Sequence, residues 1–257
     1  MLNKSTIEKV WNRKRALTIL ALIGCISIYG ITSSLLTPLL SLILESRGVG
    51  STLIGVMAMA APTGLIIGAF TISYIFRNFG GQSILLIGVT LEIALIIFLM
   101  NTQSFLSWFV IRLLGGLSDS LLFVVTETWI VEITPNEHRG RVMGFYNSIL
   151  MMSFALGPLT LSLTGTKGFL PFLICIGLLC VAGLPLLLTE PYVQSNQDKP
   201  RFGVVSFALV APLLAFGCFI VAFQDLAITS LMPIYGLRIG MTAVSYTHLT
   251  LPTKRIV

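Results

Sequence analysis

Residues 105–133 read FLSWFVIRLLGGLSDSLLFVVTETWIVEI, an apolar run that nevertheless contains Arg112, Asp119 and Glu127. Its length suits the interior of a bilayer, which a helix of about 20 apolar residues crosses. At about 100° of rotation per residue, Asp119 lies roughly 20° and Glu127 roughly 60° from Arg112 around the helix, so all three share one face. Because charges in hydrocarbon are costly, this face is expected to turn toward other helices or a water-filled transport pathway.

The composition around this run is that of an integral membrane protein. The chain has 257 residues, of which 55% are hydrophobic and 10% charged, whereas about 25% are charged in a soluble domain. No segment shows the period-two alternation of a membrane barrel strand. We therefore expect an all-α, polytopic membrane bundle. Seven spans are predicted, at Ala16–Leu44, Thr52–Phe76, Ser83–Met100, Phe105–Ile133, Val142–Thr164, Phe169–Thr189 and Phe202–Tyr235.

The basic residues predict the orientation in the membrane. Ten of them flank one side of the predicted spans: Lys4, Lys9, Arg13, Lys14, Arg15, Arg77, Arg139, Arg141, Lys199 and Arg201. The opposite loops contain only Arg47, Lys167 and Arg238. Since cytoplasmic loops are enriched in Lys and Arg, the amino terminus is expected inside, in a multi-pass protein of the cell membrane. The net charge of +6 reflects this asymmetry, so no nucleic-acid partner is expected.

Several function classes find no support in the sequence. The four cysteines, Cys25, Cys175, Cys180 and Cys218, lie inside apolar spans, where small apolar filler is favoured over disulfide or metal use. No phosphate-cradling GxxxxGK[ST] is present, so ATP-driven pumping by this chain is not predicted. No Ser/His/Asp or metal-ligand cluster appears. We therefore expect neither a cofactor nor an enzyme, and the first span is too long for a secretory signal.

The last part of the sequence differs from the rest. From about Val244 it reads VSYTHLTLPTKRIV, which resembles a translated sequencing-adaptor tail, so 244–257 is expected to be non-native and the protein to continue beyond 243. The segments LLTPLLSLILESRG (35–48) and SLMPIYGLRIG (230–240) share a Leu-x-Pro lead-in. Such a repeat after six helices predicts two six-helix halves; the alternative is chance similarity between two apolar segments.

Three motifs resemble those of one transporter family. Arg112-Leu-Leu-Gly-Gly116 is similar to an Arg-x-x-x-Gly element whose arginine projects into a central cavity. The stretch TPNEHRGRVMGFY resembles a Pro-x-x-x-Arg-Gly-Arg turn in a cytoplasmic loop, with Arg139 and Arg141 in the basic positions. Gly157-Pro158 matches the core of an antiporter element. Over residues 10–243 the chain thus resembles the major facilitator superfamily.

Two departures from the family pattern weaken parts of this inference. Between the second and third spans, only the glycine at Gly80 survives well from the usual acidic and basic motif, which puts its conformational latch in doubt. In the fifth span, the usual Gly-Gly after Gly-Pro is Leu161-Ser162. This change is expected to remove the closest helix approach and weakens an inference of antiport.

The resemblance implies a domain organisation and a set of gating residues. Residues 1–189 would form a six-helix half, 190–201 a cytoplasmic linker and 202–243 the first helix of the second half. The full-length protein is expected to act as a monomer. Conformational gating is assigned to Arg139, Arg141, Gly157 and Pro158.

The charged residues of the fourth span have two readings. Asp119 lies about 10.5 Å along the helix from Arg112, so the partner of Arg112 is expected to be substrate, water or another helix. Asp119 and Glu127 are suited to take up and release a proton as their exposure changes. Alternatively, these charges pair internally and only pin helices. For Glu92 in the third span, a structural ion pair and a functional role are equally supported by the sequence.

Other polar and aromatic residues complete the prediction. Cavity lining is expected from Tyr29, Thr32, Gln224 and Asp225. Trp108 and Trp129 are expected in an interfacial belt. The predicted function is secondary transport of a small polar or amphipathic solute by alternating access, coupled to protons or another gradient. The alternative is a half-size bundle with a structural or interaction role.

Overall fold

A computed structural model of the chain describes residues 4–76, 80–166, 168–187, 189 and 209–239. Seven of its helices are long and apolar enough to cross a membrane, which confirms the predicted number of spans. The described residues contain no strand, so the all-α prediction is also confirmed. The helices are α1 (Lys4–Ser46), α2 (Ser51–Phe76), α3 (Gly81–Asn101), α4 (Phe105–Ile133), α5 (Asn136–Thr164), α6 (Leu170–Leu187) and α8 (Pro212–Arg238).

Helix ends made of polar residues differ most from the predicted spans. The bounds of α4 agree with those predicted, whereas α5 begins at Asn136 instead of Val142. Arg139 and Arg141 therefore lie in the first turns of α5, and the prediction that they occupy a loop is wrong. Only Thr134 and Pro135 separate α4 from α5. Apolar length marks where a helix enters the bilayer but gives no signal for where it ends in water.

Two predicted segments are not among the described residues. The proposed linker 190–201 and the proposed non-native tail 244–257 both lie outside them. Helix α8 begins at Pro212, ten residues after the predicted start of the seventh span at Phe202, and only 209–211 of the residues between them are described. The assignments of these segments stay predictions.

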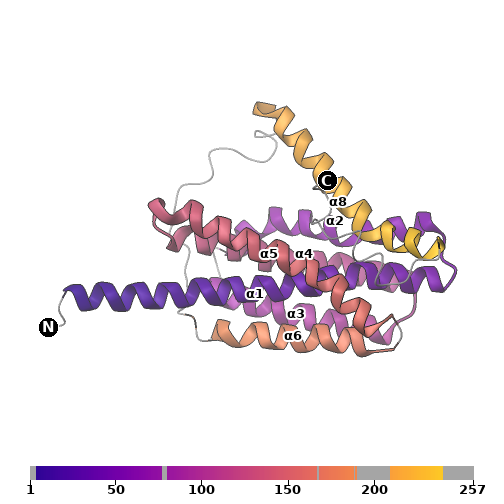
Figure 1. Cartoon of the computed structure of the whole chain (residues 1–257), viewed down its shortest axis with the longest axis horizontal. Coiled ribbons are helices and arrows are strands. Elements are labelled where there is room, and N and C mark those ends of the chain that lie inside the picture. The colour runs from indigo at the N-terminus through magenta and orange to yellow at the C-terminus, as the bar shows by residue number, and fades with distance from the viewer. Residues whose placement is uncertain (1–3, 77–79, 167, 188, 190–208, 240–257) are drawn as a thin grey trace.

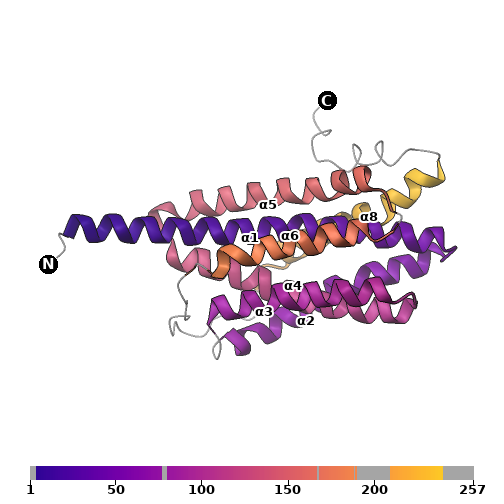
Figure 2. The same ribbon diagram turned by 90° about the horizontal axis from the view of Figure 1, so that it is seen from below.

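The first six helices form two layers, one of α1, α5 and α6 and the other of α2, α3 and α4 (Figure 2). Small residues allow the closest helix pairs to touch through their backbones. A Cβ on Gly116 of α4 would overlap the carbonyl oxygen of Ala61 in α2, and one on Gly64 would overlap that of Leu113. The contact between α2 and α4 thus depends on glycine on both sides.

The contact between α1 and α5 also depends on a glycine. A Cβ on Gly157 would overlap the Ser34 hydroxyl and lie 2.7 Å from the Leu35 amide nitrogen. The close approach of α1 and α5 is thus retained at Gly157, although Leu161-Ser162 replaces the Gly-Gly pair that usually follows Gly-Pro. Leu161 is itself buried.

The bundle has two ends, the Glu45 end and the Arg139 end. The Glu45 end contains the carboxyl ends of α1, α3, α5 and α8, and the Arg139 end contains the amino ends of α1, α3 and α5 (Figure 1). Helix α8 packs on α1 and α2 only near the Glu45 end, where Ser230 and Ile234 are buried. From there it diverges from the bundle toward its amino end (Figure 1), and residues 212–225 are largely exposed.

Candidate functional site

Arg112 lies inside the bundle. Its side chain, 8% exposed, comes from α4 and donates one hydrogen bond, at 3.4 Å, to the Thr37 hydroxyl of α1. No ion pair joins it to a carboxylate among the described residues. A guanidinium carries five N–H donors, so this one long hydrogen bond leaves most of its bonding capacity available to water, a solute or a moving carboxylate.

Asp119 lies on the same face of α4, two turns further along. Its side chain is 4% exposed, and one carboxyl oxygen, Oδ1, has no hydrogen-bond partner. The Tyr29 side chain of α1 lies within reach of the carboxyl. The expectation that Arg112 and Asp119 are too far apart for direct pairing agrees with the absence of an ion pair between them.

Glu92 of α3 faces the same region from the other side. Its side chain is 5% exposed, and its Oε2 has no hydrogen-bond partner. Both of its carboxyl oxygens lie beside Gly115 of α4, at 3.7 and 3.8 Å from the position of a Cβ there. The charges of Arg112 and Asp119 both act on this carboxyl. We refer to Arg112, Asp119, Glu92 and Tyr29 as the Arg112 cluster.

Sequence reasoning left Glu92 unconnected to Arg112. The sequence of the third span does not show which of its faces packs against another helix, because apolar residues surround the whole helix. The available signal was the Gly115-Gly116 pair beside Arg112. Gly116 admits α2, and Gly115 makes room for the Glu92 carboxyl on the other side of α4.

The polar face of α4 continues toward the Arg139 end. Glu127 is partly exposed, and it interacts with Tyr146 of α5. The Tyr146 hydroxyl is buried and makes no hydrogen bond of good geometry. The buried Thr126 hydroxyl next to Glu127 also lacks a partner. Of the four charged residues of α4, Arg112 and Asp119 are buried, whereas Glu127 and Glu132, nearer the Arg139 end, are partly exposed.

The four predicted lining residues separate into two groups. Tyr29 and Thr32 of α1 are buried, and Thr32 donates its hydroxyl hydrogen bond to the Ile28 carbonyl of its own helix. Gln224 and Asp225 are exposed, on the part of α8 that diverges from the bundle. The structure thus brings Tyr29 to Arg112 and Asp119 but does not bring Gln224 and Asp225 to them, so a shared lining stays a prediction.

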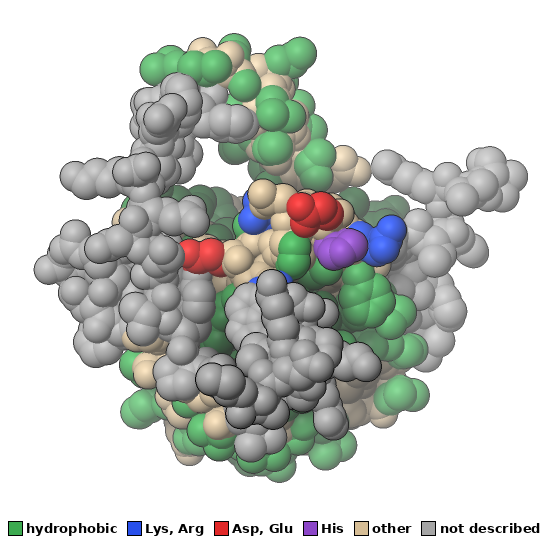
Figure 3. Space-filling model, turned by 90° about the vertical axis from the view of Figure 1, so that its left-hand side faces the viewer, with side chains coloured by type: hydrophobic (Ala, Val, Ile, Leu, Met, Phe, Trp, Pro, Cys, Tyr) green, Lys and Arg blue, Asp and Glu red, His purple; other side chains and the backbone are tan. Residues whose placement is uncertain are grey.

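The predicted gating residues lie in α5. Arg139 is half-buried with its Nε unpartnered, and Arg141 is exposed. Gly157 contacts α1, and Pro158 follows it within the helix. Figure 3 looks onto the Arg139 end, where acidic, basic and histidine side chains gather on the face of the molecule.

The prediction of an interfacial tryptophan belt is wrong for α4. Trp108 and Trp129 are each 2% exposed. The Trp108 Nε1 donates a 2.8 Å hydrogen bond to the Thr102 carbonyl, and the Arg47 guanidinium lies 4.5 Å from its ring centroid. Both side chains point into the bundle because α4 has packed neighbours on more than one side.

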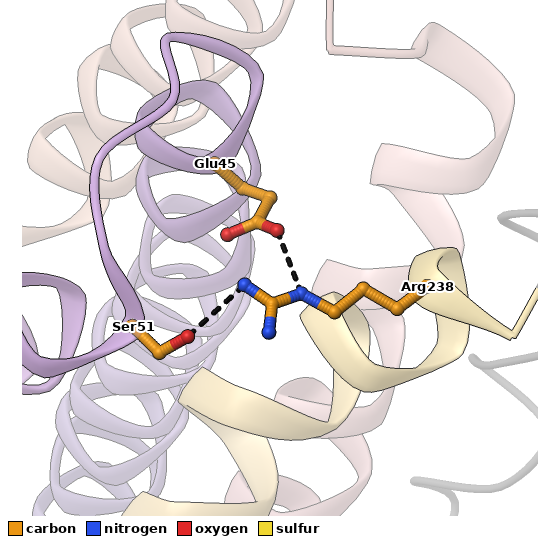
Figure 4. Close-up of polar contacts among 3 residues, drawn as sticks. All are labelled: Glu45, Ser51 and Arg238. Atoms are coloured by element: carbon orange, nitrogen blue, oxygen red, sulfur yellow. Dashed lines mark hydrogen bonds and ion pairs between the residues drawn. The ribbon is translucent and has the colours of Figure 1, made fainter.

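A polar contact that sequence reasoning missed joins α8 to the first two helices at the Glu45 end. Arg238 Nε donates to Glu45 Oε1 at 2.9 Å, and Arg238 Nη2 donates to the Ser51 hydroxyl at 3.0 Å (Figure 4). The hydrogen bond to Glu45 and the charge of that carboxylate raise the pKa of Arg238 further above its ordinary value. We refer to Arg238, Glu45 and Ser51 as the Arg238 contact.

Comparisons with known proteins agree with this architecture. The family model described as Major Facilitator Superfamily matches residues 22–252. The uncharacterized MFS-type transporter YfkF of Bacillus subtilis is 26% identical over 230 residues, which cover 86% of this chain and 58% of that protein. The uncharacterized MFS-type transporter YcaD of Escherichia coli is 24% identical over 206 residues, covering 79% of this chain and 53% of that one. The chain therefore spans between half and three-fifths of the length of these relatives.

Solved structures share the fold at low sequence identity. A bacterial homologue of the human lysosomal transporter Spinster, in an inward-facing and unoccupied conformation, aligns with a TM-score of 0.72 at 14% identity, covering 93% of this chain and 59% of that one. The nucleoside transporter NupG aligns with a TM-score of 0.69 at 14% identity, covering 92% and 62%. A D-xylose-proton symporter aligns with a TM-score of 0.59 at 17% identity, covering 91% and 64%.

Proposed function

This chain belongs to the Major Facilitator Superfamily of multi-pass membrane transporters, and we propose that its protein moves a small polar or amphipathic solute by alternating access. One observation carries the proposal. Within the described residues, Arg112 lies inside a membrane-spanning bundle with one long hydrogen bond and no ion pair. A permanent charge at that depth is expensive, and a purely structural arginine would be expected to have its donors satisfied.

The placement of α8 supports the alternating-access part of the proposal. Helix α8 contacts α1 and α2 at the Glu45 end and diverges toward the Arg139 end (Figure 1). The distribution of basic residues would put the Arg139 end in the cytoplasm. In that orientation, the helices are joined on the outside and separated on the inside, as expected for an inward-facing state.

Proton coupling is the finer part of the proposal. Asp119 is buried with an unpartnered carboxyl oxygen, and Glu127 is partly exposed nearer the Arg139 end. A carboxyl group that is buried away from water favours its protonated form, and one that water reaches favours its ionised form. A change in exposure during the transport cycle would thus bind and release a proton.

Solute counterflow tests the function. We would reconstitute the full-length native protein in liposomes loaded with unlabelled solute and measure entry of the labelled form. Nucleosides, pentoses and small amphipathic solutes form the first panel, because two structural relatives carry a nucleoside and D-xylose. Accumulation above protein-free liposomes is expected for at least one class. A folded, correctly inserted protein that exchanges none of them would favour the structural-bundle alternative.

The Arg238 contact leads to a prediction about conformation. Replacing Glu45 with glutamine is expected to shift the population toward states in which α8 is separated from α1 at this end. The shift will be partial, since exposed ion pairs stabilise weakly and Arg238 is 56% exposed. The distribution of distances between spin labels at Ser46 and Ile239 would show this shift as a larger fraction of long distances. Glu137→Gln, at the opposite end, is the matched control, and equal distributions in the two variants would contradict the prediction.

A further inference from the structure

Glu92 is a buried carboxyl to which the proposed transport cycle gives no role. It lies between α3 and α4, against Gly115. The ionisable groups that face it are Arg112 and Asp119 from α4, Cys175 from α6 and Tyr29 from α1. Ser118 of α4 lies beside it and donates its own hydroxyl to the Gly88 carbonyl at 2.9 Å. Glu92 thus belongs to the same enclosed space as the two charges of α4.

The charges in this space do not balance if Arg112, Asp119 and Glu92 are all ionised. Arg112 carries one positive charge that it does not lose in a protein. Asp119 and Glu92 would together supply two negative charges, and each is at least 95% buried. An unbalanced charge in a low-dielectric interior is costly, and a buried carboxyl avoids this cost by taking up a proton. Neutrality therefore requires one proton on the two carboxyls together.

The bonding pattern agrees with a shared proton. One oxygen of each carboxyl, Glu92 Oε2 and Asp119 Oδ1, is buried without a hydrogen-bond partner. Neither carboxyl forms an ion pair with Arg112 among the residues that the structure describes. Arg112 is therefore not held in an ion pair by either carboxylate. Each carboxyl has one oxygen that can still accept a hydrogen bond.

We propose that Glu92, Asp119 and Arg112 form one site that holds a single exchangeable proton, with Glu92 as the member contributed by α3. The proposal deepens the proposed function, on which its transport consequences rest. With the proton on Glu92, the Asp119 carboxylate balances Arg112. When the O–H bond of Glu92 breaks, the proton passes to a water molecule and leaves a second carboxylate. The cluster then carries one net negative charge and is stable only where water or a cationic group reaches it.

Infrared difference spectroscopy tests the proton count without a solute. A protonated buried carboxyl has a carbonyl-stretching band that an ionised carboxylate lacks, and the band shifts in deuterium oxide. Relative to the wild type, Glu92→Gln should lose the band of one carboxyl, because Asp119 then remains ionised beside Arg112. Arg112→Gln should gain the band of one carboxyl, because no cation remains to balance Asp119. Glu137→Gln, exposed at the start of α5, is the control and should change nothing.

The outcomes separate this inference from the transport function. An unchanged band in Glu92→Gln overturns the inference, whatever the protein transports. If that variant does not fold, Arg112→Gln decides, and an unchanged band there is equally contradictory. In the transporting protein, Glu92→Gln should reduce accumulation driven by a pH gradient by a larger factor than it reduces counterflow. Failure of the wild type to exchange any solute, together with the expected band changes, contradicts the proposed function and supports the proton site.

Discussion

Gly116→Ala is expected to sharply reduce the amount of folded protein. The added Cβ would overlap the Ala61 carbonyl oxygen and lie 2.8 Å from the Leu65 amide nitrogen. Both obstacles are backbone atoms of α2, so no side-chain rotation relieves the overlap, and the helices must separate. Overpacking of this kind costs about 1–3 kcal/mol and sometimes more. The readouts are the yield of monodisperse protein in detergent and its thermal midpoint.

A matched alanine substitution separates packing from helix propensity. Gly177 lies on the exposed side of α6, and a Cβ there would meet no atom within 4 Å. Gly177→Ala should therefore leave yield and thermal midpoint at wild-type values. Gly64→Ala, on the facing side of the same contact, should reproduce the loss because its Cβ would overlap the Leu113 carbonyl. A Gly116→Ala protein as stable as Gly177→Ala would contradict the close packing of α2 and α4.

Arg112→Gln is expected to reduce counterflow strongly at both limiting and saturating solute concentrations. Glutamine keeps some hydrogen-bonding capacity but removes the charge that balances the buried carboxyls. A loss of at least tenfold is expected, which corresponds to about 1.4 kcal/mol in the rate-limiting barrier. Arg112→Lys keeps the charge and loses the planar fork, so it should retain part of the activity.

Folding and transport are distinguished by a double variant. Arg112→Gln alone leaves two carboxyls without a cation and is expected to lower stability. Arg112→Gln combined with Asp119→Asn removes one charge of each sign, which should restore the amount of folded protein without restoring counterflow. Normal transport by Arg112→Gln at both concentrations would remove Arg112 from the mechanism.

The sequence was sufficient to predict the parts of the fold that the bilayer determines. Apolar length predicted seven spans, and the bounds of α4 were correct at both ends. Helix geometry alone predicted that Arg112 and Asp119 would not pair directly. The predicted start of α5 was wrong by six residues because the polar segment Asn136–Arg141 is also helical, and neither apolar length nor a charge pattern marks such a boundary.

Contacts between helices were beyond sequence reasoning. Spans that are apolar on every side give no indication of their neighbours, so Glu92 was not connected with Arg112, nor Arg238 with Glu45. The same limit explains Trp108, which was assigned to the lipid interface by its depth but lies under Arg47 within the bundle. Only the assembled helices show which polar groups share one enclosed space.

Transport along the polar face of α4 requires that water reach this face from one side of the membrane, which cysteine accessibility measures. The variant is Glu127→Cys in a background that lacks the native cysteines, probed with a membrane-impermeant thiol reagent in vesicles of both orientations. Val181→Cys, on the exposed side of α6, is the lipid-facing control and should react in neither. We predict that Cys at position 127 reacts when the cytoplasmic side faces the reagent. No reaction from either side, with the protein folded and inserted, would contradict an aqueous route along α4.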